Sequence, residues 1–293
     1  MLYVASSNNI NFIKQILPVM NKKMFLIACC FFCFYILKAQ TEEDTATMYP
    51  GLQYRGDTTK PEATEFYRPV PPIVTPGATP QDAPSDAIIL FDGKSLDAWE
   101  SANDTTKPAD WIIDNGELTV NKKGGGSIQT KKHFMDYQLH LEWKEPTDIQ
   151  GKGQARGNSG VFLASTGRGD AGYEVQILDC YNNTTYVNGQ TAAVYKQGIP
   201  LANACKKPGE WQTYDIIWTA PRFDASGNLT DSAKVTVLHN GVLVQNDFHL
   251  RGVTRYIGLP YYKAHGATSI KLQSHGDPSK PISFRNIWVR ALD

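Results

Sequence analysis

The chain has 293 residues, of which 41% are hydrophobic and 20% charged, and its 29 basic residues equal its 29 acidic residues. This balance, with no cluster of basic residues, argues against a nucleic-acid partner.

The first 39 residues are predicted to be an export signal. Lys22 and Lys23 precede an apolar run over residues 24–37, and the small residue Ala39 follows it. The run is shorter than the roughly 20 residues that a bilayer-spanning helix needs, so a cleaved signal is favoured and no stable membrane span is expected. The mature protein is therefore expected in the periplasm or outside the cell.

Two alternatives remain for this N-terminal segment. Translation could start at Met20 or Met24, because residues 1–19 add nothing to a signal. The stretch ending at Cys29 resembles a lipobox, so a lipid anchor is the less favoured alternative. Beyond the signal only Cys180 and Cys205 remain, and the sequence leaves open whether they form a disulfide or stay as two thiols.

Residues 40–84 are rich in Thr, Pro and acidic residues and lack an apolar period, which predicts an extended tether. Residues 85–293 show short alternating runs separated by Gly, Asn and Pro, which predicts one all-β sandwich domain without long helices. The expected strands cover residues 87–91, 111–120 (with a turn at 114–116), 127–130, 137–144, 160–164, 173–178, 211–219, 233–239, 242–246, 269–275 and 282–291.

Three of these runs alternate between apolar and polar residues. In 137–144, 173–177 and 270–275 the apolar side chains share one face of the strand and the polar ones take the other. The apolar face of a sandwich sheet must be dry and the other need not be. Glu174 is therefore expected on the face away from the core, and a curved sheet would gather the polar residues of neighbouring strands in one groove.

The groove hypothesis places candidate acids, bases and sugar-binding groups on this surface. The catalytic candidates are Glu174, His275 and Glu142, and the candidates for substrate binding are Arg156, Asn158, Ser159, Gln176, Gln273, Lys144 and Tyr195. The alternative for each residue is that a polar face of an antiparallel sheet is simply solvated. The glycine-rich loop 151–160 lacks the Lys-Ser or Lys-Thr of a phosphate loop, and metalloprotease and serine-hydrolase motifs are missing from the sequence.

Several motifs together resemble the 3-keto-disaccharide hydrolase domain family. In chain order they are FDGKSLDAWE, GNSGVFL, GYEVQILD, KPGEWQTYDI, an Asn-Gly hairpin, LQSHGDP and ISFRNIWVR, and they extend from Ile88 to Arg290. The resemblance implies a jelly-roll sandwich of two antiparallel sheets, similar to the concanavalin A-like lectins and glucanases. One departure is Ser274, where the family places Asp before the histidine, and Asp277 is the candidate replacement for orienting His275.

The resemblance also implies a chemistry. Related retaining glucanases carry carboxylates at alternate positions of one strand, whereas Gln176 and Leu178 follow Glu174 here, so a two-carboxylate mechanism on this strand is not expected. A sugar oxidised at C3 has an acidic proton at C2, and its removal allows the enolate to expel the C1 oxygen before water adds. Glu174 and His275 would be base and acid in either order.

The remaining expectations concern partners. The substrate would be a 3-keto-disaccharide or 3-keto-glucoside made by a sugar 3-oxidoreductase, and no cofactor is required by the sequence. A calcium ion held by Asp170, Asp179 or Glu142 stays open, because no loop has the regular spacing of a calcium site. The alternative function is a non-catalytic, lectin-like carbohydrate-binding module.

Overall fold

A computed structural model describes residues 59–292 and divides the chain into two units, Met1–Pro72 and Ile73–Asp293. The expected signal over residues 1–39 lies outside the described residues, as does the expected tether up to residue 58. In the first unit a short 3-10 helix, η1, covers Pro61–Thr64. Within residues 59–292 no helix has the length and apolar character to cross a bilayer.

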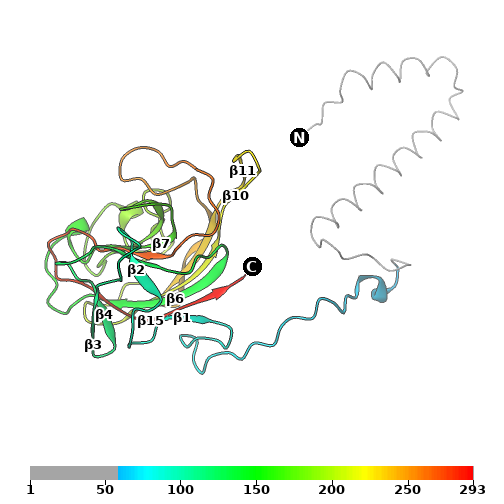
Figure 1. Ribbon diagram of the computed structural model, residues 1–293, viewed down its shortest axis with the longest axis horizontal. Coiled ribbons are helices and arrows are strands. Elements are labelled where there is room, and N and C mark those ends of the chain that lie inside the picture. Colours follow the sequence, from blue (N-terminus) through cyan, green and yellow to red (C-terminus); the bar gives the residue numbers. More distant parts are fainter. Residues whose placement is uncertain (1–58, 293) are drawn as a thin grey trace, which may run out of the picture. The chain divides into compact units, whose positions relative to one another are not determined.

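The second unit is built from two main antiparallel sheets (Figure 1). The eight-stranded sheet contains β1 (Ile88–Phe91), β3 (Ile112–Asp114), β4 (Glu117–Thr119), β6 (Tyr137–Lys144), β9 (Gln212–Thr219), β12 (Lys234–His239), β13 (Val242–His249) and β15 (Ser283–Ala291). The five-stranded sheet contains β2 (Trp99–Ser101), β5 (Ile128–Thr130), β7 (Ser159–Ser165), β8 (Gly172–Ile177) and β14 (Lys271–Leu272). A small hairpin and two 3-10 helices complete the unit: β10 (Arg222–Phe223), β11 (Leu229–Asp231), η2 (Gly153–Ala155) and η3 (Val187–Gly189).

The predicted all-β sandwich is confirmed. Strand β6 has the expected bounds, and a turn at Asn115 and Gly116, both with positive φ, separates β3 from β4 as expected. The strands that the sequence did not indicate are β2, β10 and β11, which have two or three residues each and are too short for alternation to be visible.

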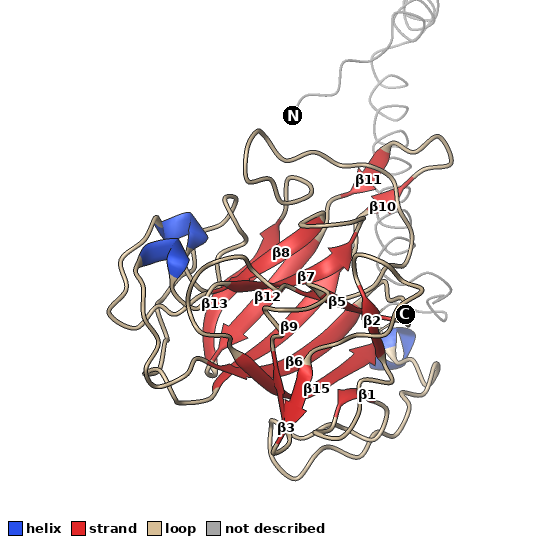
Figure 2. Ribbon diagram, turned by 60° about the vertical axis from the view of Figure 1, so that its left-hand side comes forward, coloured by secondary structure: helices blue, strands red, loops and turns tan. Residues whose placement is uncertain are grey.

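The core lies between the two sheets, which Figure 2 shows as two layers of strands. Buried tyrosines connect these layers by hydrogen bonds as well as by packing. The Tyr214 hydroxyl of β9 donates to the Gln176 carbonyl of β8 at 2.6 Å, and the Tyr137 hydroxyl of β6 donates to the Leu163 carbonyl of β7 at 2.6 Å. Both rings are fully buried, so each hydroxyl needs the partner it has.

Residues 73–84, expected to belong to the tether, are part of the same compact unit as the sandwich. The Gln81 carbonyl accepts hydrogen bonds from Asn286 at 3.0 Å and from the Trp288 indole at 2.9 Å, both on β15. The backbones of Thr75 and Ser85 are also bonded at 2.9 Å. The composition of residues 73–84 is that of an extended tether, but these hydrogen bonds hold the segment against the eight-stranded sheet.

The outer face of the eight-stranded sheet carries a buried ionic cluster. Glu142 of β6 accepts from Arg285 at 2.7 Å and from Asn286 at 3.0 Å, and its carboxylate lies 3.7 Å from His140. Burial alone would raise the pKa of Glu142, but the contacts with His140, Asn286 and Arg285 outweigh it and lower this pKa to about 2.

The two cysteines of the second unit, Cys180 and Cys205, form a disulfide, which resolves the choice that the sequence left open. Their Cα atoms lie 5.9 Å apart, and the bond closes a sequence separation of 25 residues. The enclosed segment contains η3 and borders the edge of the five-stranded sheet, because Val194 forms an antiparallel bridge with Val175 of the edge strand β8.

We expect the disulfide to stabilise the sandwich by roughly 3 kcal/mol, as estimated for a loop of this length. The double variant Cys180→Ser/Cys205→Ser should therefore unfold at a lower urea concentration than the oxidised wild type. Wild-type protein treated with a reductant is the control and should match the variant. Coincident urea curves for oxidised wild type and variant would contradict the expectation.

The low pKa of Glu142 predicts a loss of stability in acid. A carboxyl with a lowered folded-state pKa contributes stability that is complete above the unfolded value near 4.5 and is lost as the pH falls toward about 2. Glu142→Gln should flatten the dependence of the unfolding free energy on pH in this window, measured by urea titration at several pH values. Part of the slope should persist, because Asp277 also has a pKa lowered to about 2.

Candidate functional site

The outer face of the five-stranded sheet holds a polar cavity of about 490 Å³, which we call the inner cavity. Alternation on β8 turns Tyr173, Val175 and Ile177 into the core and leaves Glu174 and Gln176 on the opposite face. Six of the expected site residues line the cavity: Asn158, Glu174, Gln176, Tyr195, Gln273 and His275. The remaining lining side chains come from loops and, for Gln154, from η2: Gln154, Asp170, Tyr186, Lys196, Thr254 and Tyr256.

Glu174 is only 5% exposed, and its carboxyl occupies space left by a glycine on the neighbouring strand. A Cβ atom on Gly160 of β7 would stand 2.4 Å from Glu174 Oε1, so a larger residue would push the carboxyl out of place. Burial, and after it the nearby Asp170 carboxylate, raise the pKa of Glu174 to about 8, although Lys271 acts in the opposite direction. Glu174 is consequently protonated for the most part at neutral pH.

His275 lies at the edge of the same cavity, with its side chain 36% exposed. Its Nδ1 is 3.3 Å from Asp277 Oδ2 and 3.1 Å from the backbone nitrogen of Asp277. Burial alone would raise the pKa of Asp277, but hydrogen bonds with His275, Ser279 and Lys122 lower it to about 2. Asp277 is thus an ionised partner for His275. It is the candidate replacement for the aspartate that the family places before the histidine, where this chain has Ser274.

A buried lysine organises the loop between β7 and β8. Lys271 of β14 is fully buried and donates to three backbone carbonyls, those of Gly167 at 3.1 Å, Gly169 at 2.7 Å and Ala171 at 3.0 Å. Burial lowers the pKa of its ammonium group to about 8. The loop held in this way carries Asp170, which accepts from Gln273 at 2.8 Å inside the inner cavity.

Amide and hydroxyl groups form the rest of the cavity wall. With its amide nitrogen turned toward Glu174, Gln176 donates to Glu174 Oε1 at 2.9 Å and to the Ser159 carbonyl at 3.1 Å. The hydroxyls of Tyr186 and Tyr195 are 2.6 Å apart. Together with the Lys196 ammonium, these groups supply hydrogen-bond donors for the oxygen atoms of a sugar.

The expectation that Glu142 shares a surface with Glu174 is wrong. Both side chains point away from the core, but β6 belongs to the eight-stranded sheet and β8 to the five-stranded one, so the two carboxyls lie on opposite sides of the sandwich. Lys144 is on the β6 side as well, where it donates to Glu117 at 2.6 Å and lies over the Trp211 ring. Alternation identified the polar face of each strand correctly but could not assign the strands to sheets.

Arg156 and Ser159 also lie outside the cavity lining. The Arg156 Nε lies 2.6 Å from Asp179 Oδ2, an ion pair without a hydrogen-bond alignment, beside a buried Glu145 whose pKa is raised to about 8 mainly by burial. The Ser159 hydroxyl donates to the Gln273 carbonyl at 2.7 Å. Both residues support the strands and loops that surround the cavity.

The three carboxylates considered for calcium are not brought together. Asp170 pairs with Gln273, Asp179 with Arg156 and Glu142 with Arg285. Among the residues that the structure describes, no group of three His, Cys, Asp or Glu side chains has the arrangement of a metal site.

The cavity residues that sequence reasoning missed come mostly from loops, where no period marks a face. Thr254, Tyr256 and Lys196 lie in loops, and Gln154 lies in the short helix η2. For Lys271 a signal existed, because alternation placed it on the same polar face as Gln273 and His275. Its role was invisible because its partners are backbone carbonyls from a distant loop.

Comparisons with known proteins agree with this picture of the fold. A candidate glycosyl hydrolase of Parabacteroides distasonis with a solved crystal structure is 55% identical, with a TM-score of 0.73, and the alignment covers 83% of this chain and 98% of that one. A second candidate glycosyl hydrolase from the same organism is 18% identical, with a TM-score of 0.54 over 71% of this chain and 94% of the other, and this likeness concerns the fold alone.

The comparisons also identify the family. A curated 3-keto-disaccharide hydrolase of Bacteroides thetaiotaomicron is 30% identical in an alignment 158 residues long that covers 44% of this chain and 51% of the relative. The chain thus spans about half the length of this curated relative. Residues 86–290, nearly the whole sandwich, match the family described as a 3-keto-alpha-glucoside-1,2-lyase-like domain, with the inner cavity inside the matched region. On this match the chain belongs to the 3-keto-alpha-glucoside-1,2-lyase-like domain family.

Proposed function

We propose that this protein is an exported enzyme that cleaves 3-keto-disaccharides or other 3-keto-glucosides by elimination followed by hydration. The family and the curated relative support the substrate class. The observation that carries the mechanism is the presence, in one cavity, of a buried protonated carboxyl at Glu174 and an imidazole at His275 with an ionised partner.

His275 is the proposed base. Nδ1 accepts from the Asp277 backbone N–H at 3.1 Å in one tautomer and can donate to the Asp277 carboxylate at 3.3 Å in the other. In the second tautomer Nε2 has a lone pair that can take the C2 proton of the keto sugar. The electrons move to the C3 carbonyl and form an enolate, and the ionised Asp277 stabilises the imidazolium that results. The exposed edge of His275 leaves it accessible to a bound sugar.

Glu174 is the proposed acid. With a pKa of about 8 it holds a proton at neutral pH, and it can give that proton to the C1 oxygen as the enolate expels the leaving alcohol. Glu174 is then a carboxylate and can accept a proton from the water that adds to C1. The imidazolium returns its proton to C2, so the net reaction is hydrolysis and both groups regain their starting state.

The developing enolate oxygen needs donors. The amides of Asn158 and Gln273 line the cavity, as does the ammonium of Lys196, whereas both N–H groups of Gln176 are bonded to Glu174 and to the Ser159 carbonyl. Preorganised donors in a water-poor site stabilise a developing negative charge far more than water does. These groups support binding of the 3-keto oxygen and the neighbouring hydroxyls.

Export is supported by the Cys180–Cys205 disulfide, a bond typical of oxidising compartments. The ketone that activates C2 must come from an oxidation of the C3 hydroxyl, so the proposed reaction requires an upstream sugar 3-oxidoreductase. Cleavage downstream of such an enzyme would release a 3-keto monosaccharide and the leaving alcohol.

Glu174→Gln should reduce turnover of a 3-keto-disaccharide by a factor of about 10² to 10⁴, the usual contribution of a general acid. Turnover of 4-nitrophenyl 3-keto-glucoside should fall far less, since nitrophenolate leaves without a proton. His275→Ala should lose both activities. Proton NMR in deuterated water should show exchange at C2 in Glu174→Gln and none in His275→Ala.

Controls and contradicting outcomes follow from the same assay. The unoxidised disaccharide should remain intact with every variant, because its C2 proton is not acidic. Equal turnover of both substrates by wild type and Glu174→Gln would reject Glu174 as the acid. Binding of the keto sugars by wild type without cleavage of any of them would favour a lectin-like module.

Asp170→Asn should move the alkaline limb of the pH–rate profile to lower pH. Removal of a neighbouring negative charge makes ionisation of Glu174 easier and so lowers its pKa from about 8. The substitution keeps the Oδ1 acceptor for Gln273, so the loop geometry should be retained. The measurement is kcat/KM for a 3-keto-disaccharide between pH 6 and 10, and an unmoved limb would contradict the role of Asp170.

A further inference from the structure

A second cavity of about 740 Å³ adjoins the inner cavity, and we call it the outer cavity. Its wall includes Ile257, Tyr261, Lys263 and His265, none of which lines the inner cavity. Asp170, Thr254 and Tyr256 line both cavities. The two cavities therefore share part of their walls, and neither the family match nor the proposed mechanism assigns a ligand to the outer one.

The loop over residues 252–263 is fixed to the strand that carries Glu174. The Thr254 amide donates to the Gly172 carbonyl at 2.7 Å, and its hydroxyl accepts from the Glu174 amide at 3.0 Å. The Val253 amide donates to the Tyr261 carbonyl at 2.9 Å, which closes the loop on itself. The side chains of this loop are thus held at a defined place relative to the Glu174 carboxyl.

Close packing at the base of this loop depends on a glycine. Gly252 has a φ of +134°, and a Cβ atom there would stand 2.3 Å from the Tyr261 carbonyl carbon. A further tie comes from Lys196, whose ammonium donates to the Tyr256 carbonyl at 2.7 Å. These contacts hold the backbone of the 252–263 loop in one conformation.

The outer cavity presents large apolar and aromatic side chains to solvent. Tyr261 is 50% exposed, Tyr256 72% and Ile257 76%, although each belongs to a loop with a fixed backbone. Exposed apolar groups gathered beside a cavity mark a binding site more often than free surface. Tyrosine rings combine a flat apolar face with a polar edge, which suits stacking against another ring.

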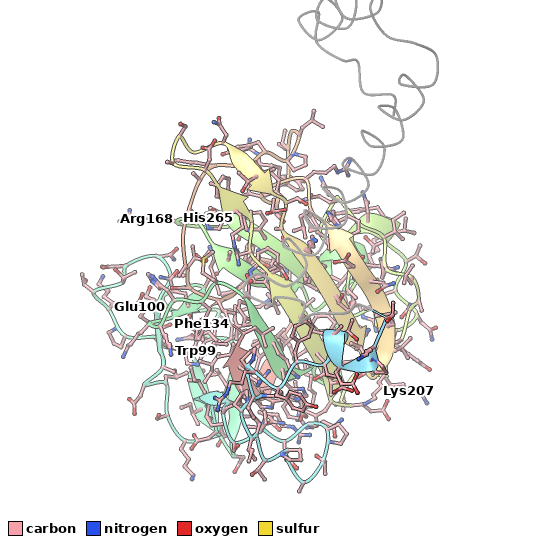
Figure 3. All side chains as sticks on the ribbon, turned by 90° about the vertical axis from the view of Figure 1, so that its right-hand side faces the viewer. Trp99, Glu100, Phe134, Arg168, Lys207 and His265 are labelled. Atoms are coloured by element: carbon pink, nitrogen blue, oxygen red, sulfur yellow. A yellow bond between two sulfur atoms is a disulfide. The ribbon has the colours of Figure 1, made fainter. Side chains whose placement is uncertain are left out.

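The charge around this surface is one-sided. Residues 248–276 contain no aspartate or glutamate, and two basic residues of this segment, Arg255 and Lys263, are in the wall of the outer cavity. Asp170 is the single carboxylate in the wall of the outer cavity. The surface therefore suits an uncharged or anionic ligand and disfavours a cationic one. In Figure 3 His265, from this wall, lies at the opposite end of the view from Lys207.

The junction of the two cavities is the place where a glycosidic bond would break. Glu174 lines the inner cavity, and Asp170 and Thr254, which interact with it, line both cavities, so the proposed acid lies next to the shared wall. An acid that protonates the C1 oxygen has the keto sugar on one side and the leaving group on the other. With His275 and the amide donors in the inner cavity, the outer cavity is left for the leaving group.

We propose that the outer cavity binds the leaving group of the glycoside as an uncharged, ring-bearing alcohol that stacks on the side chains of the 252–263 loop. This rests on the proposed function. The ring can belong to a second sugar or to an aromatic alcohol, since both have an apolar face. The protein would then select glycosides by the ring they release as well as by the ketone at C3.

The test compares three 3-keto-glucosides that differ only in the leaving group: a disaccharide, the phenyl glucoside and the methyl glucoside. Tyr261→Ala and Ile257→Ala remove exposed side chains and keep the backbone bonds of the loop. We expect kcat/KM for the preferred ring-bearing substrate, relative to the methyl glucoside, to fall about five- to twentyfold in Tyr261→Ala, mainly through KM. A larger fall for the phenyl glucoside than for the disaccharide identifies an aromatic alcohol, and the reverse identifies a sugar.

Matched controls are Tyr67→Ala and Ile112→Ala, which remove side chains that are 77% and 53% exposed and lie in neither cavity wall. Their ratios should equal that of wild type. Unchanged ratios in both Tyr261→Ala and Ile257→Ala would overturn the proposal while leaving the function intact. If the wild type cleaves none of the three substrates, the proposed function is rejected, and the subsite is then tested by calorimetric binding of the same sugars. Weaker binding of the ring-bearing sugars alone in Tyr261→Ala supports the subsite. Equal affinities of wild type and Tyr261→Ala for all three sugars reject it.

Discussion

The alternation of side chains along β8 is the constraint on which the candidate site depends. Tyr173, Val175 and Ile177 are fully buried in the core, and the Tyr214 hydroxyl holds the backbone of this strand from the opposite sheet. A shift of the strand by one residue would bury Glu174 among apolar side chains, at a large cost in free energy. The register of β8 is thus fixed by the core, and the position of Glu174 follows from it.

The chemistry of Glu174 then arises from its surroundings. Gly160 gives the carboxyl a place close to the neighbouring strand, where water has little access, and Asp170 adds a second acidic group nearby. The Lys271 ammonium opposes the rise in the pKa of Glu174 only in part, and its three hydrogen bonds go to backbone carbonyls and not to the Glu174 carboxyl. His275 has the opposite environment, with an exposed edge and an ionised partner. Two groups with such different surroundings are suited to opposite roles in proton transfer.

Much of the fold could be predicted from the sequence, since alternation and turn residues mark every strand of six or more residues and the Asn115–Gly116 turn. Part of the site followed from the same signal, namely Glu174, Gln176, Gln273 and His275. The pairing of strands into sheets was not visible, which is why Glu142 was placed on the wrong side of the sandwich. Contacts between distant loops, such as that of Lys271 with residues 167–171, leave no period in the sequence at all.

The three carbonyls around Lys271 form the kind of oxygen-lined recess in which loops of many proteins hold a dissociable metal cation. Here the positive charge at the centre is covalently part of β14, so it cannot be lost by dilution or exchanged for another ion. The order of the 167–171 loop therefore follows the folding equilibrium of the whole domain and not the mineral content of the surroundings. For a protein proposed to work outside the cytoplasm, where ion concentrations are not controlled by the cell, a tethered charge keeps Asp170 in place as long as the chain is folded and the pH stays below the Lys271 pKa of about 8.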